Sequence, residues 1–149
     1  MEYIQGGQDA GDGCFLCHAR EQDDESAQVL VRSDRAFVIL NRYPYNPGHV
    51  MVAPTRHVGE LEALEADEVA DVNYLLQRAL HGLKESMAPE GFNLGMNLGR
   101  VAGAGVPDHV HWHVVPRWEG DTNFMPILGR TKVLPELLAD TYAKLKRTM

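Results

Sequence analysis

Three of the seven histidines in this 149-residue chain stand at alternate positions of one short stretch. The stretch "DHVHWHVVPRW" contains His109, His111 and His113, with Val110 and Trp112 between them. Side chains of a β-strand alternate between its two faces, so a strand here would put the three imidazoles on one face and the apolar residues in a core. We therefore expect a strand whose histidine face carries the chemistry.

Three uses of such a face compete. It could be an ordinary polar face, or a metal site, since neutral imidazoles ligate zinc. It could also serve nucleophilic catalysis at phosphorus, where one imidazole attacks and its neighbours hold phosphate oxygens and supply protons. That chemistry also needs N–H donors, which the preceding loop "GRVAGAG" offers. Any tight turn uses glycines, so the segment alone leaves metal binding and phosphorus chemistry open.

The only two cysteines, Cys14 and Cys17, form a C-x-x-C pair. In a reducing compartment such a pair favours metal binding or redox chemistry over a structural disulfide. A redox pair of the thioredoxin kind needs a following helix on a βαβ unit, and we expect the acidic "HAREQDDES" not to supply one, with "EQDDE" a solvated loop. A zinc site needs two further ligands.

The composition describes a single globular domain, with 44% hydrophobic and 23% charged residues. A net charge of -7 argues against a partner that is a nucleic-acid polymer, which would need a basic face. A small nucleotide is still possible, because backbone N–H groups can hold its phosphates. No secretory signal and no apolar run of ~18 residues is visible, so we expect a cytoplasmic protein with no membrane partner.

The first half of the chain predicts strands and then a long helix. "AQVLVRSDRAFVILN" predicts two strands joined by a turn, and "HVMVAP" predicts a third. Apolar residues at spacings of three to five between Glu60 and Met87 predict a short helical turn and one long amphipathic helix, with Asp67 as its N-cap.

The second half predicts two more strands and a helix. "GFNLGMNLG" alternates strictly, which predicts a half-buried strand before the glycine loop. Its expected buried face consists of Phe92, Leu94, Met96 and Leu98. Residues 134–146 predict a C-terminal amphipathic helix. Only one helical crossover is available, which favours an antiparallel α+β domain. We expect residues 1–13 to be a flexible N-terminal arm and residues 14–149 to be one domain.

The motifs together resemble a known family. "HVHWHVV" fits the His-φ-His-φ-His-φ-φ signature of the histidine triad family of nucleotide hydrolases and transferases. "LNRYPYNPGHVMVAPTRHVGELEAL" resembles that family's segment with an Asn and then Pro-Gly-His before the long helix. "PRWEGDTNFM" and "TKVLPELL" resemble its bacterial subgroup of diadenosine tetraphosphate phosphorylases and Fhit-like proteins. The resemblance implies an antiparallel sheet with one long central helix and a C-terminal helix.

The resemblance also implies a mechanism. His111 would attack the α-phosphorus of an adenine-type nucleotide, such as a dinucleoside polyphosphate, and form a covalent nucleotidyl-histidine that water or inorganic phosphate releases. His113 would hold phosphate oxygens or assist the leaving group, with His49 facing the same site. Asn41 would bind ribose hydroxyls. The phosphate would be held by Asn97 and a loop containing Gly103, Ala104 and Gly105. The alternatives are a nucleoside phosphoramidate hydrolase and a non-catalytic, zinc-containing nucleotide-binding module.

For the cysteine pair, the resemblance supplies the two further ligands. Family members with a C-x-x-C take them from a histidine after the Pro-Gly-His strand and from the first triad histidine, here His57 and His109. With Cys14 and Cys17 these form a closed, structural zinc site, and no organic cofactor is expected. The family also implies a homodimer that pairs the long helix and one strand of each subunit. His18 is expected to be exposed, and His81 to lie on the surface or at an interface.

One position departs from the pattern. The Fhit and Hint branches carry a glutamine in the loop before the triad, where it contacts the phosphate, and Gly105 stands there in this chain. Backbone N–H groups or another residue must therefore replace that contact. The choice between hydrolysis and phosphorolysis is left open by this departure.

Overall fold

The computed structural model describes residues 13–121 and 138–148. The predicted arm therefore lies outside the described residues, except for its last position. In chain order the elements are α1 (Phe15–Glu21), α2 (Asp24–Ala27), β1 (Val29–Arg32), β2 (Ala36–Leu40), β3 (Val50–Pro54), the 3₁₀ turn η1 (Leu61–Ala63), α3 (Ala66–Met87), β4 (Gly91–Gly95), the 3₁₀ turn η2 (Arg100–Ala102), β5 (Trp112–Arg117) and α4 (Leu138–Thr148). None of the described helices is long and apolar enough to cross a membrane.

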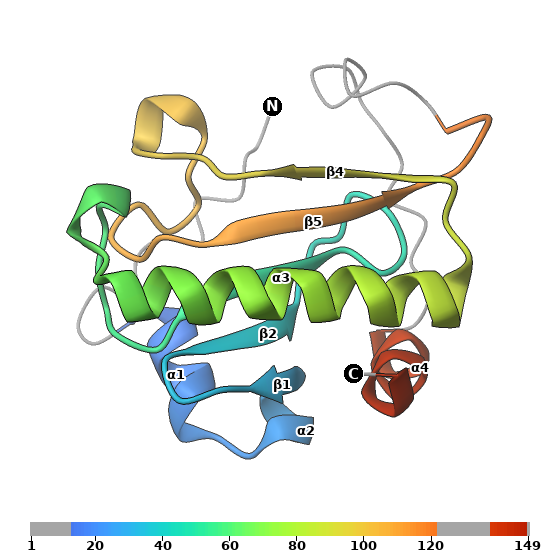
Figure 1. The fold of residues 1–149 in the computed structure, drawn as a ribbon, viewed down its shortest axis with the longest axis horizontal. Coiled ribbons are helices and arrows are strands. Elements are labelled where there is room, and N and C mark those ends of the chain that lie inside the picture. Colours follow the sequence, from blue (N-terminus) through green and yellow to red (C-terminus); the bar gives the residue numbers. More distant parts are fainter. Residues whose placement is uncertain (1–12, 122–137, 149) are drawn as a thin grey trace.

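The five strands form one sheet in the order β1-β2-β3-β5-β4 (Figure 1). Every neighbouring pair is antiparallel, which confirms the predicted α+β class. The helix α3 links β3 to β4 and lies along one face of the sheet, where α4 also packs. The short helices α1 and α2 pack on the opposite face.

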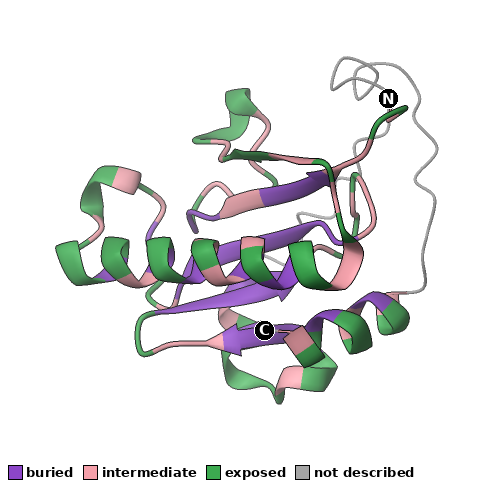
Figure 2. Ribbon diagram, turned by 45° about the vertical axis from the view of Figure 1, so that its right-hand side comes forward, coloured by how far each residue is buried: buried purple, intermediate pink, exposed green. Residues whose placement is uncertain are grey.

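Apolar side chains fill both faces of the central strands, which Figure 2 shows as buried. In β2, Val38 and Leu40 pack towards α3, whereas Phe37 and Ile39 pack towards α1. A strand covered on both faces needs apolar residues at successive positions, which explains the nearly continuous apolar run of this segment.

The expectation that "HAREQDDES" supplies no helix is wrong, because two short helices, α1 and α2, include most of this stretch. Leu16 and Ala19 lie one turn apart on α1 and are both buried against the sheet. Asp23 caps α2 by accepting a hydrogen bond from the Ser26 N–H at 3.0 Å. One or two turns are too short for a clear periodic pattern, so tertiary packing decides whether such a helix forms.

Two predicted boundaries also change, and a third is only partly described. The long helix is capped by Glu65 rather than Asp67, because Glu65 and Glu68 form a reciprocal capping box. The strand β4 ends at Gly95, which pairs with His113 near the first residue of β5. Leu94 and Leu98, which belong to the expected buried face, are about half exposed. The predicted helix over residues 134–146 is described only from Leu138 onwards.

The histidine segment is only partly a strand. The strand β5 begins at Trp112, so His113 lies on it but His109 and His111 precede it. The Val110 N–H donates to the Val58 carbonyl at 2.7 Å, so the segment before β5 is bound to the loop after β3. Pro107, which precedes this segment, has no N–H to donate. His113 nevertheless pairs with Met51, which faces the α1 side of the sheet.

Candidate functional site

The Pro-Gly-His loop delivers His49 to the start of β3. Gly48 has φ +80°, and a Cβ there would stand 2.6 Å from the Met87 sulfur. Only glycine fits this left-handed, crowded position. The following His49 is 1% exposed and its N–H donates to the Asn46 carbonyl at 3.1 Å. The turn therefore fixes the backbone that carries the buried imidazole.

His49 and His113 form a hydrogen-bonded pair whose direction follows from the backbone. The Tyr45 N–H donates to His49 Nδ1 at 3.1 Å, so this nitrogen carries a lone pair. His49 Nε2 therefore carries the hydrogen and donates it to His113 Nδ1 at 2.9 Å. A neutral His113 then carries its own hydrogen on Nε2. These hydrogen bonds therefore make His113 Nε2–H a hydrogen-bond donor.

His111 has the opposite polarity. Its Nδ1 lies 2.9 Å from the His109 carbonyl oxygen, which can only accept, so Nδ1 carries the hydrogen. Its Nε2 is left with a lone pair. The rings of His111 and His113 stand 5.0 Å apart, edge to face. The ring of His111, whose Nε2 has a free lone pair for attack, and the ring of His113, whose Nε2–H can donate a hydrogen bond, are therefore neighbours.

Burial keeps these imidazoles neutral. It lowers the pKa of His49 to about 3, with a further contribution from His113, and lowers the pKa of His113 to about 4. Burial also lowers the pKa of His111. A neutral imidazole is the form that attacks an electrophile, so the cluster is poised for nucleophilic chemistry near pH 7.

A second cluster contains Cys14, Cys17, His57 and His109, whose ligand atoms all lie within 4.8 Å of one another. His109 Nδ1 is 3.3 Å from the Cys14 sulfur and 3.5 Å from the Cys17 sulfur, and His57 Nδ1 is 3.3 Å from the latter. A tetrahedral zinc would separate sulfur and nitrogen ligands by about 3.6 Å. The donor set and its spacing therefore fit zinc.

The surroundings of His109 support the same use. Its Nε2–H donates to the Pro54 carbonyl at 2.8 Å, which leaves Nδ1 as a lone pair directed at both sulfurs. Partial burial and the Cys14 sulfur raise the pKa of Cys17 to about 11, so a nearby cation would be needed to favour its thiolate. The His109 carbonyl also accepts from His111, which links the two clusters directly.

The predicted nucleotide-binding residues fall in two places. Asn41 lies beside His49, with its amide nitrogen 3.4 Å from the ring nitrogens. Asn97 lies at the other end of the sheet, where its amide donates to the Gly103 carbonyl at 3.5 Å. It thereby ties the loop that contains Ala104 and Gly105. His18 and His81 are exposed, as expected.

The larger described cavity does not contain the histidine cluster. It has a volume of about 660 Å³ and is lined by the segments 57–63, 98–99 and 107–108. It touches the metal cluster only at His57, so its size does not mark the reacting centre.

Sequence reasoning missed the groups that orient the imidazoles. The Tyr45 N–H and the Pro54 carbonyl belong to the backbone, so no side-chain pattern announces them. The Tyr45 ring also packs against the His49 ring, with the centroids 4.7 Å apart and the planes tilted by 34°. An aromatic residue in a Pro/Gly loop was the one available signal.

Comparison with known proteins supports one family. A model of the HIT domain matches residues 22–120. The AP-4-A phosphorylase of Mycobacterium tuberculosis is 49% identical over 118 residues, which cover 79% of this chain and 60% of that protein. An uncharacterised HIT-like protein of Methanocaldococcus jannaschii is 34% identical over 95 residues, which cover 64% and 72%.

Among solved structures, a zinc-bound histidine triad family protein from Mycobacterium smegmatis superposes with a TM-score of 0.74 at 25% identity, covering 92% of this chain and 93% of that one. This chain spans only 60% of the length of the M. tuberculosis relative. The matched domain, the histidine spacing and the sheet topology agree: the chain belongs to the histidine triad (HIT) family.

Proposed function

We propose that this protein is a nucleotidyl hydrolase or transferase that cleaves adenine-type dinucleoside polyphosphates, such as diadenosine tetraphosphate, at the α-phosphate. The observation that carries the proposal is the opposite polarity of two neighbouring rings, the His111 Nε2 lone pair and the His113 Nε2–H. The similarity to an AP-4-A phosphorylase supports the substrate class.

In the first step, His111 Nε2 attacks the α-phosphorus and forms a P–N bond while the P–O bond to the polyphosphate breaks. His113 Nε2–H donates a hydrogen bond to the leaving oxygen, which departs as the polyphosphate anion, and His49, which donates to His113, orients that ring. The product is a covalent nucleotidyl-His111 and, from diadenosine tetraphosphate, free ATP. We propose that Asn41, whose amide lies beside His49, binds the ribose hydroxyls.

In the second step, an acceptor breaks the P–N bond. Water would release AMP and one proton to the solvent, whereas inorganic phosphate would release ADP, and in both cases the electrons of the P–N bond return to His111 Nε2. Gly105 leaves the loop without the glutamine side chain of other family branches. The N–H groups of Gly103 and Ala104 donate within the loop, to the Arg100 and Gly99 carbonyls at 3.0 and 3.2 Å. We propose that Asn97 and the remainder of this loop hold the phosphate, and that the space left by Gly105 admits inorganic phosphate as acceptor.

We further propose that Cys14, Cys17, His57 and His109 hold a zinc ion with a structural role. Four protein ligands leave no open position for substrate, so the ion would supply a cross-link. The support is the spacing of the four donors together with the zinc-bound relative.

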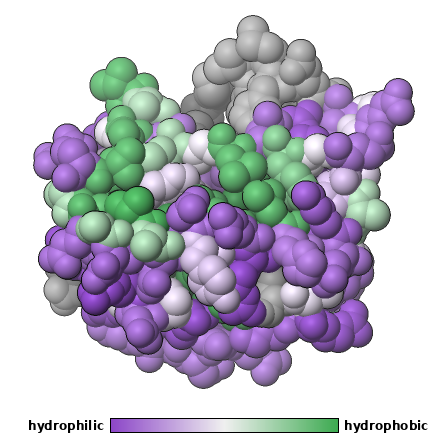
Figure 3. All heavy atoms as spheres, viewed as in Figure 1, coloured by the Kyte–Doolittle hydropathy of each residue, from purple (hydrophilic) through white to green (hydrophobic). Residues whose placement is uncertain are grey.

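A homodimer through β4 and α3 is part of the same proposal. The outer edge of β4 has no strand beside it among the described residues. Apolar side chains gather on the face that carries this strand and the following loop (Figure 3). The exposed ones are Val69, Tyr74, Leu94, Leu98 and Val101. An unpaired edge flanked by apolar residues is typical of a surface that another chain covers.

The experiment is a product assay on diadenosine tetraphosphate with and without inorganic phosphate. We expect ATP and ADP with phosphate, and ATP and AMP without it. The His111→Asn variant should fold normally and lose turnover, while the exposed control His18→Asn keeps it. Unchanged turnover in His111→Asn would overturn the mechanism. AMP binding without turnover in the wild type would favour the non-catalytic module instead.

A further inference from the structure

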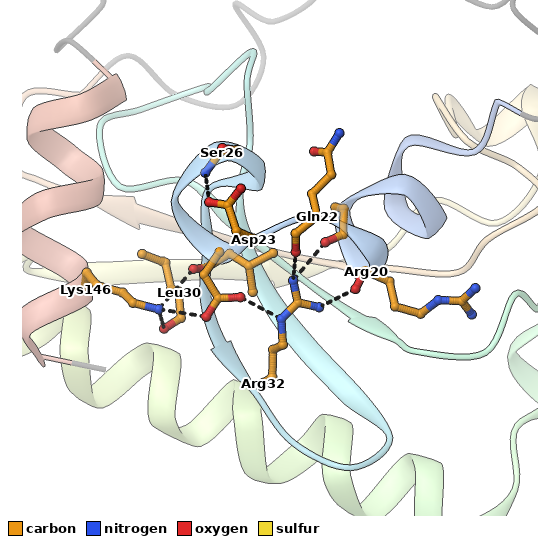
Figure 4. A network of polar contacts seen from close by, with 10 residues as sticks. Arg20, Gln22, Asp23, Ser26, Leu30, Arg32 and Lys146 are labelled. Atoms are coloured by element: carbon orange, nitrogen blue, oxygen red, sulfur yellow. Dashed lines mark hydrogen bonds and ion pairs between the residues drawn. The ribbon is translucent and has the colours of Figure 1, made fainter.

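A single side chain on β1 holds the end of α1 (Figure 4). The Arg32 guanidinium donates to the Ala19 carbonyl at 2.8 Å and to the carbonyls of Arg20 and Gln22 at 3.2 Å each. Its Nε also donates to Asp24 Oδ1 at 2.7 Å. Arg32 therefore binds the carbonyl groups at and just beyond the C-terminal end of α1.

The helix α1 needs such support. It has seven residues, and its N-cap Cys14 makes no side-chain capping bond. A helix this short is unstable alone, and its last carbonyls lack partners within the helix. Arg32 satisfies these carbonyls and also places a positive charge where the helix dipole favours one. Burial of Leu16 and Ala19 is a second restraint, and the Arg20 guanidinium, which donates to the Thr55 carbonyl at 3.2 Å, is a third.

The same helix carries the sulfur ligands. Cys14 precedes α1 directly and Cys17 lies in its first turn. Their sulfurs stand 3.3 to 3.5 Å from imidazoles that come from positions 40 to 95 residues further along the chain. Zinc bonds tolerate only small displacements, so the sulfurs meet the imidazoles only where α1 is held.

We propose that Arg32 is a positioning residue of the metal centre, acting on Cys14 and Cys17 through α1. This inference rests on the proposed zinc site. Asp24 extends the connection, because its other oxygen accepts from Lys146 of α4 at 3.1 Å (Figure 4). Arg32 binds Asp24 and backbone carbonyls and not the side chain of a metal ligand, so its effect on zinc is transmitted by the helix.

The test is zinc affinity, measured by competition with a chromophoric chelator. We expect Arg32→Met to weaken zinc binding about 10-fold, the lower end of the range seen when support outside a metal's ligands is removed. Arg32→Lys should lie between, since one ammonium cannot span the carbonyls that a guanidinium fork reaches. The control is Arg35→Met in the turn after β1, where Arg35 forms an exposed ion pair with Asp67, and it should bind zinc as the wild type does.

A second measurement separates positioning from general stability. Melting temperatures are compared with and without zinc, and the rise caused by zinc should shrink in Arg32→Met. If Arg32→Met lowers both temperatures equally and binds zinc with wild-type affinity, the inference is wrong while the zinc site stands. If the wild type itself binds no zinc, the zinc site and this inference both fail.

Discussion

His49 and His111 each have one ring nitrogen held by a backbone group. The Tyr45 N–H selects the lone pair of His49 Nδ1, and the His109 carbonyl selects the hydrogen of His111 Nδ1. These two bonds determine which nitrogens remain for chemistry. Burial makes both imidazoles resist protonation, because the charged form loses its water. At His111 the hydrogen bond to the His109 carbonyl acts in the opposite direction, whereas the Tyr45 N–H would oppose a proton on His49 Nδ1.

This resistance predicts a pH dependence of stability. Burial lowers the pKa of His49 from an ordinary 6.5 to about 3. Below pH 6.5 the unfolded chain binds a proton that the folded chain does not, so the stability from His49 is complete above pH 6.5 and is lost as the pH falls towards 3. At pH 5 the loss amounts to about 2 kcal/mol.

The measurement is urea unfolding of the wild type and His49→Asn at pH 7 and pH 5. The free energy of unfolding should fall about 2 kcal/mol less in His49→Asn than in the wild type. Contributions from the metal ligands are common to both proteins and cancel in the difference. An equal fall in both would show that His49 is protonated in the folded state at pH 5.

At the scale of elements, β4 is the strand with the least support. It pairs with β5 on one side only, and its residue Leu94 and the following Leu98, just beyond the strand, are 47% and 44% exposed. The helix α3 below it exposes Val69 and Tyr74. We expect a second copy of the chain to cover all four of these side chains.

Leu94→Lys tests that expectation. Lysine on a strand edge opposes pairing with another edge, because its charge would have to be buried. We expect the wild type to sediment as a dimer and Leu94→Lys to dissociate to the monomer at concentrations at least 10-fold higher than the wild type, which corresponds to about 1.4 kcal/mol or more. Glu62→Lys on the exposed turn η1 serves as the control. A monomeric wild type, or a variant as dimeric as the wild type, would contradict the β4 interface.

At the scale of the whole molecule, the cysteine and histidine cluster joins segments that are distant in sequence. It links α1, the loop after β3 and the segment before β5. The His109 carbonyl then passes this restraint to His111. A zinc ion bound there would stabilise the fold by an amount that grows with the logarithm of the free zinc concentration above the Kd, and it would act on the reaction only by holding the histidine segment.

Chelation should therefore separate stability from chemistry. Removing zinc from a protein held at a free zinc concentration of about 100 times the Kd should cost about 3 kcal/mol of unfolding free energy. Turnover of diadenosine tetraphosphate at low temperature, where the metal-free chain stays folded, should persist at first. Immediate and complete loss of turnover with an unchanged circular dichroism spectrum would instead show that zinc takes part in the reaction.

Much of this architecture was predictable from local pattern. The alternation in residues 91–98, the helical spacing between Glu60 and Met87 and the single crossover led to the antiparallel α+β sheet. Together with the family resemblance, the spacing of the histidines and the C-x-x-C pair led to two sets of residues, which the structure brings together as two clusters. Residue type and hydrophobic period are properties of short segments, so both can be recognised without knowledge of the fold.

What the triad residues do was decided by tertiary structure. The sequence places His109, His111 and His113 at one spacing, yet His109 meets sulfurs from 92 and 95 residues away while His113 meets His49 from 64 residues away. The helix α1 and the tautomers of His109 and His113 depend on long-range contacts too, whereas backbone groups four and two residues away set the tautomers of His49 and His111. The groups responsible include the Tyr45 N–H, the Pro54 carbonyl and the buried face of the sheet. Every residue has the same backbone groups, so only folding determines which of them meets an imidazole.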